Sequence, residues 1–311
     1  MRLHIDLGTD HQLITRLLPY WEKMGIEIVS LDQAQIHLSF VTFTKPSSIP
    51  KILRLDGVYY NVLSPYILEN RPLLKAYREC QGIIFQSQYS LRCAQAHFGN
   101  LDPALPRRVI YNGMDPGWND PVRHENFNIV VCSRWRVWKR LQEMIDTVAE
   151  VVETYPDIRL HIVGVGKGMT VRGRHEFIRW AGDLNYIQMR EFYRKMDLAI
   201  HIAKRDWCPN VVLEFMAAGI PTIVSDRGGG ATELAELVDS SLIAMDDDDP
   251  SDTEPVAQYT SAWNKLSSDF RANVQSKIQL TYHDRRRVSL PTTLTTEHVA
   301  ESYLKFMEEF V

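Results

Sequence analysis

The sequence predicts an α/β protein made of two doubly wound domains, each with a parallel sheet and helices on both faces. The chain has 311 residues, which is long for one hydrophobic core and comfortable for two. Hydrophobic residues make up 45% and charged residues 24%, the balance of a folded protein. Short apolar runs alternate with amphipathic helical segments, and this alternation is typical of parallel βαβ units.

Apolar runs bounded by turn residues predict the elements of the first half. A helix after residue 10 would place Leu13, Leu17 and Tyr20 on one face. Strands are expected at residues 3–7, 27–30, 36–43, 51–55, 82–85 and from 108, and further helices at about 72–79 and 89–98. Asn112 and Gly113 give a turn signal after the last of these strands.

Residues 115–126 carry two prolines and a glycine without periodicity, which is typical of a linker. We therefore predict a first domain over residues 1–118 and a second over residues 119–282. In the second domain, strands are expected at 128–132, 159–163, 198–202 and 221–224, and helices at 141–154, 189–196 and 210–218. Helical periodicity returns at 256–280 and 297–310, and the tail over residues 283–311 is expected to pack back on the first domain.

The charge composition argues against nucleic acid or an anionic membrane as a partner of the whole surface. The formal net charge is −4 and the isoelectric point is near 6.2. The acidic run 246–249 and the basic run 285–287 are expected to be solvated loops. Any anion site must therefore be local.

The cysteines and the hydropathy pattern indicate a cytoplasmic protein. The four cysteines lack C-x-x-C pairing and zinc-site spacing, so we expect reduced thiols and no bound metal. The first residues are too few and too charged for a signal peptide, and no apolar stretch reaches ~18 residues. We therefore expect a soluble chain without a transmembrane segment, while peripheral membrane contact and the oligomeric state stay open.

The first candidate site is the basic segment 133–140, which follows a predicted buried strand. Ligands of doubly wound sheets bind at the carboxyl ends of the strands. Arg134 can make a forked contact with phosphate and Lys139 a point-charge contact, so the pair suits a diphosphate. Solvated basic residues are the alternative. Trp135, Trp138 and Trp207 either stack on a ligand or pack within the protein, and the sequence leaves both open.

The second candidate site is the segment 206–214, which follows the strand predicted to end near residue 202. Asn210 is expected to cap the next helix, whose N-terminal N–H groups would attract an anion. Asp206 and Glu214 would accept hydrogen bonds from sugar or ribose hydroxyls. Stabilisation of the helix dipole by these carboxylates is the alternative.

Two glycine-rich segments complete the candidates. Residues 226–230 carry three successive glycines directly after a strand, which would allow close approach of the backbone to a ligand, or form an ordinary turn. Residues 164–170 resemble a phosphate-binding P-loop, but His161 stands where glycine is needed and Gly168 follows the lysine. We interpret this segment as a strand-to-helix turn, and we do not expect ATP or NAD.

At these motifs the sequence resembles glycosyltransferase family 4, also described as glycosyl transferases group 1, over residues 51–238. Arg134 and Lys139 match the Arg and Lys of the family's G-R-x-x-x-x-K-G segment, although both glycines are replaced. Asp206 and Glu214 match its E-x7-E motif. Residues 84–87, 109–115 and 179–182 are further parallels. The resemblance implies the GT-B fold, in which two Rossmann-like domains face a central cleft, and a retaining, metal-independent hexosyltransferase reaction.

The resemblance also assigns roles to residues. The catalytic group would be Arg134, Lys139, Asp206 and Glu214, with the first two on the donor diphosphate, Asp206 on the sugar and Glu214 on the ribose. Arg179 and Gly182 would seat the nucleobase. The other donor-side residues would be Ser133, Gly164, Gly166, Trp207, Cys208, Pro209, Asn210 and Val211. No cofactor is implied, and UDP- or GDP-sugars are the expected donors.

The sequence departs from the family pattern on the acceptor side. Only Gly8 remains of a glycine pair after the first strand, and Asp56 stands where a histidine is common. The acceptor, which could be a glycan, a lipid-linked sugar or a small molecule, is therefore open. A catalytically silent GT-B protein that binds a nucleotide sugar is the alternative. A dinucleotide-dependent oxidoreductase lacks its first-strand fingerprint here.

Overall fold

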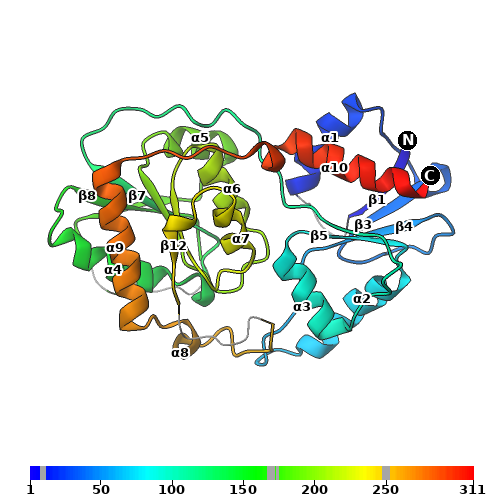
Figure 1. Ribbon diagram of the computed structural model, residues 1–311, viewed down its shortest axis with the longest axis horizontal. Coiled ribbons are helices and arrows are strands. Elements are labelled where there is room, and N and C mark those ends of the chain that lie inside the picture. The colour runs from blue at the N-terminus through cyan, green and yellow to red at the C-terminus, as the bar shows by residue number, and fades with distance from the viewer. Residues whose placement is uncertain (8–11, 167–171, 173–174, 247–252) are drawn as a thin grey trace. The chain divides into compact units, whose positions relative to one another are not determined.

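The computed structural model describes residues 1–7, 12–166, 172, 175–246 and 253–311 (Figure 1). The chain divides into two compact units. Unit 1 comprises Met1–Asp115, Thr253–Val256 and Thr292–Val311, and unit 2 comprises Pro116–Asp252 and Ala257–Pro291. Each unit holds a six-stranded sheet whose neighbouring strands are parallel, with helices around it. The predicted fold class, two doubly wound α/β domains, is confirmed.

The sheet of unit 1 has the strand order β2-β1-β3-β4-β5-β6. Its strands are β1 Arg2–Leu7, β2 Glu27–Ile28, β3 Ile36–Phe40, β4 Lys51–Leu55, β5 Gly82–Phe85 and β6 Arg107–Val109. Its helices are α1 Gln12–Lys23, α2 Tyr66–Glu79, α3 Gln88–Phe98 and α10 Thr296–Met307. All residues of β3 and β5 are buried, because helices cover both faces of a parallel sheet.

Helix α10 packs on α1 over one face of this sheet, while α2 and α3 lie on the other (Figure 1). Leu17 and Trp21 of α1 and Tyr303 and Phe306 of α10 are buried in the shared core. The Trp21 indole N–H donates to the carbonyl of Ala300 at 3.2 Å, which satisfies a polar group inside an apolar interface. The expected apolar face of residues 297–310 is thus the face that α10 buries.

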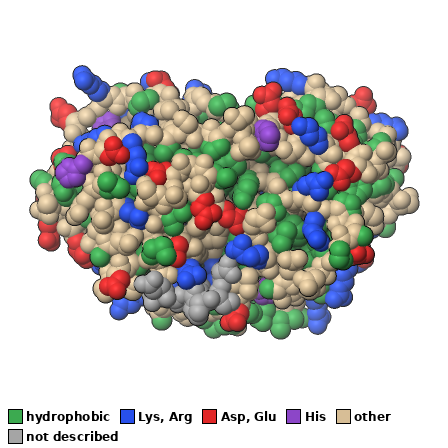
Figure 2. All heavy atoms as spheres, in the orientation of Figure 1, with side chains coloured by type: hydrophobic (Ala, Val, Ile, Leu, Met, Phe, Trp, Pro, Cys, Tyr) green, Lys and Arg blue, Asp and Glu red, His purple; other side chains and the backbone are tan. Residues whose placement is uncertain are grey.

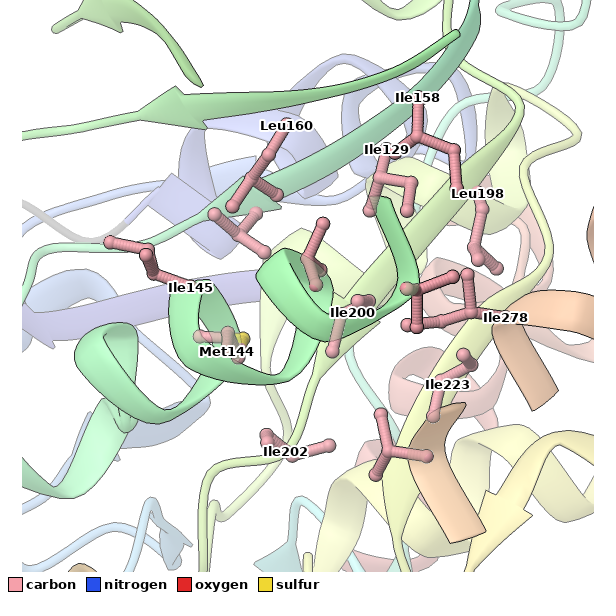
Figure 3. Close-up of a cluster of buried hydrophobic side chains, with 14 of the residues drawn as sticks. Ile129, Met144, Ile145, Ile158, Leu160, Leu198, Ile200, Ile202, Ile223 and Ile278 are labelled. Atoms are coloured by element: carbon pink, nitrogen blue, oxygen red, sulfur yellow. The ribbon is translucent and has the colours of Figure 1, made fainter. Parts of the chain in front are cut away.

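The sheet of unit 2 has the order β12-β11-β10-β7-β8-β9. Its strands are β7 Phe127–Cys132, β8 Ile158–Val163, β9 Ile178–Gly182, β10 Leu198–His201, β11 Thr222–Ser225 and β12 Ile243–Ala244. Its helices are α4 Leu141–Val152, α5 Tyr186–Tyr193, α6 Asn210–Ala217, α7 Gly230–Glu236, α8 Ser261–Asn264 and α9 Ser268–Asp284. Figure 3 shows the main core, in which α4 and α9 pack isoleucines and leucines against the central strands.

Several expectations about the second half were wrong. Residues 256–280 do not form one helix: α8 and α9 are separate, because Ser267 caps α9 by accepting the Phe270 N–H at 3.1 Å. In each charged run one residue expected to lie in a solvated loop has a partner within the protein instead, while residues 247–249 lie outside the described residues. Asp246 is buried and forms an ion pair with Arg140 at 2.8 Å, and Arg287 donates to the carbonyl of Ala218 at 2.6 Å. Charged side chains become buried where they find such partners.

Half-buried His161 in β8 gives unit 2 a predictable acid sensitivity. Its Nε2 lies 3.0 Å from Asn128 Oδ1, and burial and nearby Arg179 lower the pKa of His161 to about 4. In the unfolded chain, His161 binds a proton below its ordinary pKa near 6.5, whereas in the folded chain it does so only near pH 4. The contribution of His161 to the free energy of unfolding is therefore present above pH 6.5 and is lost as the pH falls toward 4. From His161 we expect a loss of roughly 2 kcal/mol between neutral pH and pH ~5. Urea unfolding at the two pH values measures it, and His161→Asn should flatten the dependence.

Candidate functional site

The carboxyl ends of three neighbouring strands of unit 2 come together at one edge of its sheet. The N–H of Ser133, just after β7, donates to the carbonyl of Val163 at 3.3 Å. The N–H of Gly164, just after β8, donates to the carbonyl of Gly182 at 2.6 Å. Three of the expected donor-side residues, Ser133, Gly164 and Gly182, are therefore neighbours at the edge where doubly wound sheets bind ligands.

Gly164 and Gly182 both have a backbone conformation that favours glycine, but a side chain would also meet a collision at Gly164. Gly164 has φ +94°, and a Cβ there would collide with the carbonyl oxygen of Ser133. Gly182 has φ +70°, but a Cβ there would meet no atom within 4 Å. Gly166 is exposed in the same connection after β8. The backbone of Gly164 can thus lie against the segment after β7 because it has no side chain.

The segments after β10 and β11 are joined by backbone hydrogen bonds. The Asp206 N–H donates to the carbonyl of Gly228 at 3.0 Å, and the Gly230 N–H donates to the carbonyl of Asp206 at 2.7 Å. A Cβ at Gly230 would collide with the carbonyl of Trp207. The glycines of residues 228–230 therefore allow two loops to touch, and α7 starts at the last of them.

Lys139, Asp206 and His201 form a cluster at this edge. The Lys139 Nζ donates to Asp206 Oδ2, and the His201 Nε2 lies 3.0 Å from the same oxygen. The side chains of Lys139 and Asp206 are 17% and 16% exposed, and that of His201 is 5% exposed. The structure thus brings together two residues that the sequence placed in separate motifs.

The electrostatics of the cluster fix its charge state. Burial raises the pKa of Asp206, but the Lys139 ammonium and the His201 hydrogen bond outweigh burial, so the net pKa lies well below its usual range. Burial lowers the pKa of His201, and its bond to Asp206 offsets part of this effect. At neutral pH the cluster is therefore a carboxylate held by an ammonium and by the N–H of a neutral imidazole.

The remaining residues of the basic segment have different surroundings. Arg134 is exposed. Trp135 is 4% exposed and donates its indole N–H to the carbonyl of Val163 at 2.9 Å, so its ring is part of the core. Trp138 is half-buried and stacks on Tyr259 with 4.8 Å between ring centroids. Trp207 is half-buried as well.

Helix α6 begins one residue earlier than an asparagine cap at position 210 would give. Pro209 occupies the N-cap position with extended backbone, and Asn210 is the first helical residue, so the prediction that Asn210 caps the helix was wrong. Proline fits there because its fixed φ suits the extended cap conformation. Cys208 and Pro209 are buried, Asn210 and Val211 are half-buried, and half-buried Glu214 lies one turn into the helix.

Arg179 is not at the same edge as the other donor-side residues. It lies opposite His161 in the middle of β9, three residues before Gly182, which corresponds to about 10 Å along a strand. Its guanidinium donates to the carbonyls of Glu176 at 2.6 Å and Ile178 at 2.9 Å. The structure thus separates the two residues expected to seat the nucleobase.

Unit 1 has a polar cluster at the carboxyl ends of its own strands. Arg54 of β4 is fully buried, forms an ion pair with Asp56 and donates to Asn112 Oδ1 at 2.5 Å and to Gln86 Oε1 at 3.3 Å. The Asp56 side chain is 31% exposed. Its carboxylate thus lies at a strand end beside a guanidinium, where it could accept hydrogen bonds from sugar hydroxyls. Gly8, the other expected acceptor-side residue, lies outside the described residues.

Sequence reasoning missed His201 and Arg54. Both lie in buried strands, where a single polar residue in an apolar run gives no sign that it faces a site. In the ranges that the structure describes, no group of three or more His, Cys, Asp or Glu side chains could hold a metal ion. Among the same residues, no helix combines the length and the apolar character needed to cross a bilayer.

Comparison with known proteins supports a glycosyltransferase family. Residues 126–254, which form most of unit 2, match the family model of glycosyl transferases group 1. The match covers the Lys139 and Asp206 segments and the glycines after β11. None of the curated proteins compared matches the chain.

Solved structures resemble the chain over its whole length. Anabaena Alr3699/HepE in complex with UDP and glucose is 16% identical, with a TM-score of 0.61 and 99% of each chain covered. The lipopolysaccharide outer core galactosyltransferase WaaB in its apo form is 12% identical, with a TM-score of 0.64 and 100% of each chain covered. The pneumococcal O-GlcNAc transferase GtfA in complex with UDP and GlcNAc is 14% identical, with a TM-score of 0.57, and 95% of this chain covers 59% of that one. At such identities the likeness shows a shared fold, the GT-B fold.

Proposed function

We propose that this chain is a family 4 glycosyltransferase that moves a hexose from a nucleotide-diphosphate sugar to an acceptor with retention of configuration and without a metal. The observation that carries the proposal is the Lys139–Asp206–His201 cluster at the strand ends of unit 2, beside the start of α6. The group 1 match over residues 126–254 includes every residue of this cluster. A cytoplasmic site of action fits the four cysteines, which are all buried.

The cluster suits a donor that is anionic at one end and rich in hydroxyls at the other. An ammonium has three N–H donors, so Lys139 can bind Asp206 and a phosphate oxygen together. Exposed Arg134 is the second diphosphate ligand in this proposal. Asp206, held as a carboxylate, accepts hydrogen bonds from the sugar hydroxyls, and the N–H groups at the start of α6 lie next to it in sequence.

The proposed chemistry follows from where charge develops. As the bond between the anomeric carbon and the phosphate oxygen breaks, negative charge grows on the diphosphate and positive charge on the sugar. Lys139 and Arg134 stabilise the leaving diphosphate, and Asp206 is an anion near the sugar. The acceptor hydroxyl attacks from the face that the diphosphate leaves, and the diphosphate takes the acceptor proton. Glu214 binds the ribose, and Asp56 in unit 1 is proposed to contact the acceptor or the sugar.

UDP is the proposed nucleotide. HepE and GtfA, whose structures resemble this chain, were both solved with UDP. The first test is thermal unfolding of the full chain with UDP, GDP or ADP, because a ligand of the native state raises the midpoint. At a hundredfold excess over Kd the stabilisation is about 2.7 kcal/mol, which should raise the unfolding midpoint of a unit of this size by several degrees, about 5–10 °C. We expect UDP to give the largest shift.

A second measurement separates catalysis from binding. Consumption of the UDP-sugar with a panel of glycan, lipid-linked and small-molecule acceptors would establish transfer, and the anomeric configuration of the product would test retention. If UDP binds but no donor is consumed with any acceptor, the chain is a catalytically silent protein that binds a nucleotide sugar, and the proposed enzyme activity is wrong. If none of the nucleotides shifts the midpoint, the donor site proposed here is wrong.

A further inference from the structure

Unit 1 exposes a group of large hydrophobic side chains at the start of α2. We call it the apolar patch, and it consists of Tyr59, Val62, Leu63, Ile67 and Leu68. The exposed fractions of these side chains are 48%, 48%, 62%, 65% and 54%. Single exposed apolar residues are ordinary on protein surfaces, but five within ten consecutive positions concentrate apolar surface in one stretch of the chain, which is typical of an interaction site.

The backbone of the apolar patch is held in place by hydrogen bonds. Asn70 of α2 accepts from the Tyr59 N–H at 2.8 Å and donates to the Tyr59 carbonyl at 2.7 Å. The Val62 N–H donates to the carbonyl of Val256 at 3.0 Å, and the Ser64 hydroxyl donates to Glu69 at 3.2 Å. These bonds fix the direction in which the patch presents its side chains, so binding would cost little ordering of the chain.

Cations continue the same face of the helix. Arg71, Lys75 and Arg78 are exposed and follow Ile67 at spacings of four, four and three residues, which places all four side chains on one side of α2. We call these three residues the cation row. The acidic residue among them, Glu79, contacts Lys75 at 3.9 Å and Lys51 at 3.7 Å. Where α2 lies in Figure 1, at the lower right, Figure 2 shows hydrophobic and basic side chains next to one another.

A groove adjoins the apolar patch between α2 and α3. Its volume is about 500 Å³. Its lining includes Ile67, Arg71 and Leu74 of α2, His97 and Phe98 of α3, and Thr253, Glu254 and Pro255. The apolar side chains and the guanidinium of Arg71 border the same space. A groove with this apolar lining can take a flexible hydrocarbon chain.

We propose that the apolar patch and the cation row dock unit 1 on an anionic lipid bilayer. Leucine, isoleucine and tyrosine side chains enter the headgroup region, while the arginines and the lysine bind lipid phosphates. The net charge of the whole chain is −4, so a bilayer with negative headgroups repels most of its surface and attracts the cation row. The charge pattern therefore selects one orientation of unit 1 on the bilayer. It favours a surface that bears phosphates over the surface of a partner protein, because a partner protein would pair these cations with fixed carboxylates. This inference is independent of the donor chemistry in unit 2.

Vesicle sedimentation of the full chain tests the proposal. The probes are vesicles of phosphatidylcholine alone and of equal parts phosphatidylcholine and phosphatidylglycerol, without any nucleotide. We expect binding to the anionic vesicles that weakens as salt is added, and little binding to the neutral ones. Arg71→Gln, Lys75→Gln and Arg78→Gln together should weaken binding about thirtyfold, since each exposed cation is worth about fivefold and Lys75 is partly neutralised by Glu79. Leu63→Ser with Ile67→Ser should weaken it about tenfold or more.

The chain offers matched controls for both changes. Ile187 in unit 2 is 74% exposed, comparable to Ile67, and Lys305 pairs with Glu301 at 3.9 Å as Lys75 does with Glu79. Ile187→Ser and Lys305→Gln should keep wild-type binding. Equal binding to both kinds of vesicle, or no loss in the two sets of variants, would overturn the proposal. So would self-association of the chain that the Leu63 and Ile67 substitutions abolish, because the patch would then bind a second copy.

Discussion

Replacing Lys139 by alanine is expected to lower the turnover number by a factor of about 10² to 10³, the scale seen when one preorganised electrostatic group is removed. The variant loses the ammonium proposed to bind the leaving diphosphate. It also leaves the largely buried Asp206 carboxylate without its cationic partner, with hydrogen bonds to His201 and to the Trp207 N–H. Because burial raises the pKa of Asp206 and Lys139 lowers it, the pKa should rise in the variant. The acid limb of the pH–rate profile should therefore move to higher pH, which initial rates measured between pH ~4 and ~8 would show.

A neighbouring cation provides the control for this variant. Arg136 lies in the same segment as Lys139, but it is exposed and its guanidinium sits 5.0 Å from the ring centroid of Trp138. Arg136→Ala should keep turnover near the wild-type value, whereas Arg134→Ala should lose about a hundredfold or more. If folded Lys139→Ala turns over donor as fast as the wild type, Lys139 has no part in the mechanism.

Gly164→Ala is expected to destabilise unit 2 by about 3 kcal/mol or more. Two costs add in this variant. A side chain at φ +94° is strained by about 1–2 kcal/mol, and its Cβ would collide with the carbonyl oxygen of Ser133, which the backbone would have to move to avoid. Because Ser133 is part of the proposed donor site, the affinity for UDP should fall as well. Urea unfolding and UDP titration measure the two effects.

Gly182→Ala is the matched control, because it shares the positive φ without the collision. With φ +70° and no atom within 4 Å of the added Cβ, this variant should cost about 1 kcal/mol. Equal losses in the two variants would mean that strain alone acts at Gly164. Retention of full stability by Gly164→Ala would show that the segments after β7 and β8 move apart easily, against the rigid strand-end site described here.

The sequence predicted the buried strands well because parallel strands are apolar on both faces. β4 Lys51–Leu55 and β5 Gly82–Phe85 have the expected bounds. The sequence failed to predict elements that are buried on one side only or that begin with residues atypical of a helix. β9 is an edge strand whose Arg179 and Trp180 are exposed, so no apolar run marks it. α7 begins at Gly230, a poor helix former that is required there by contact with Trp207.

The site could be predicted only as separate segments. Topology explains why the segments converge, since the carboxyl ends of neighbouring parallel strands share an edge. Contacts between the side chains of different loops, by contrast, cannot be predicted from a local sequence pattern. Lys139 and Asp206 are 67 positions apart, and no local pattern shows that their side chains meet. Trp135 likewise could be a stacking platform or a core residue by its sequence alone, and its hydrogen bond to Val163 decides for the core. The roles assigned to these residues remain predictions.

The packing of α10 on α1 has a consequence for how the protein is made. Trp21 and the carbonyl it binds, that of Ala300, are separated by 279 positions, so a ribosome releases the inner face of α1 long before its cover exists. During that interval the face is an exposed stretch of aliphatic and aromatic groups, which chaperones bind and which promotes aggregation. The delay in unit 2 is shorter, because α9 contacts α4 across 121 positions, between Arg271 and Glu150. Unit 2 is therefore expected to fold first during translation, and the fold of unit 1 is completed only after α10 leaves the ribosome.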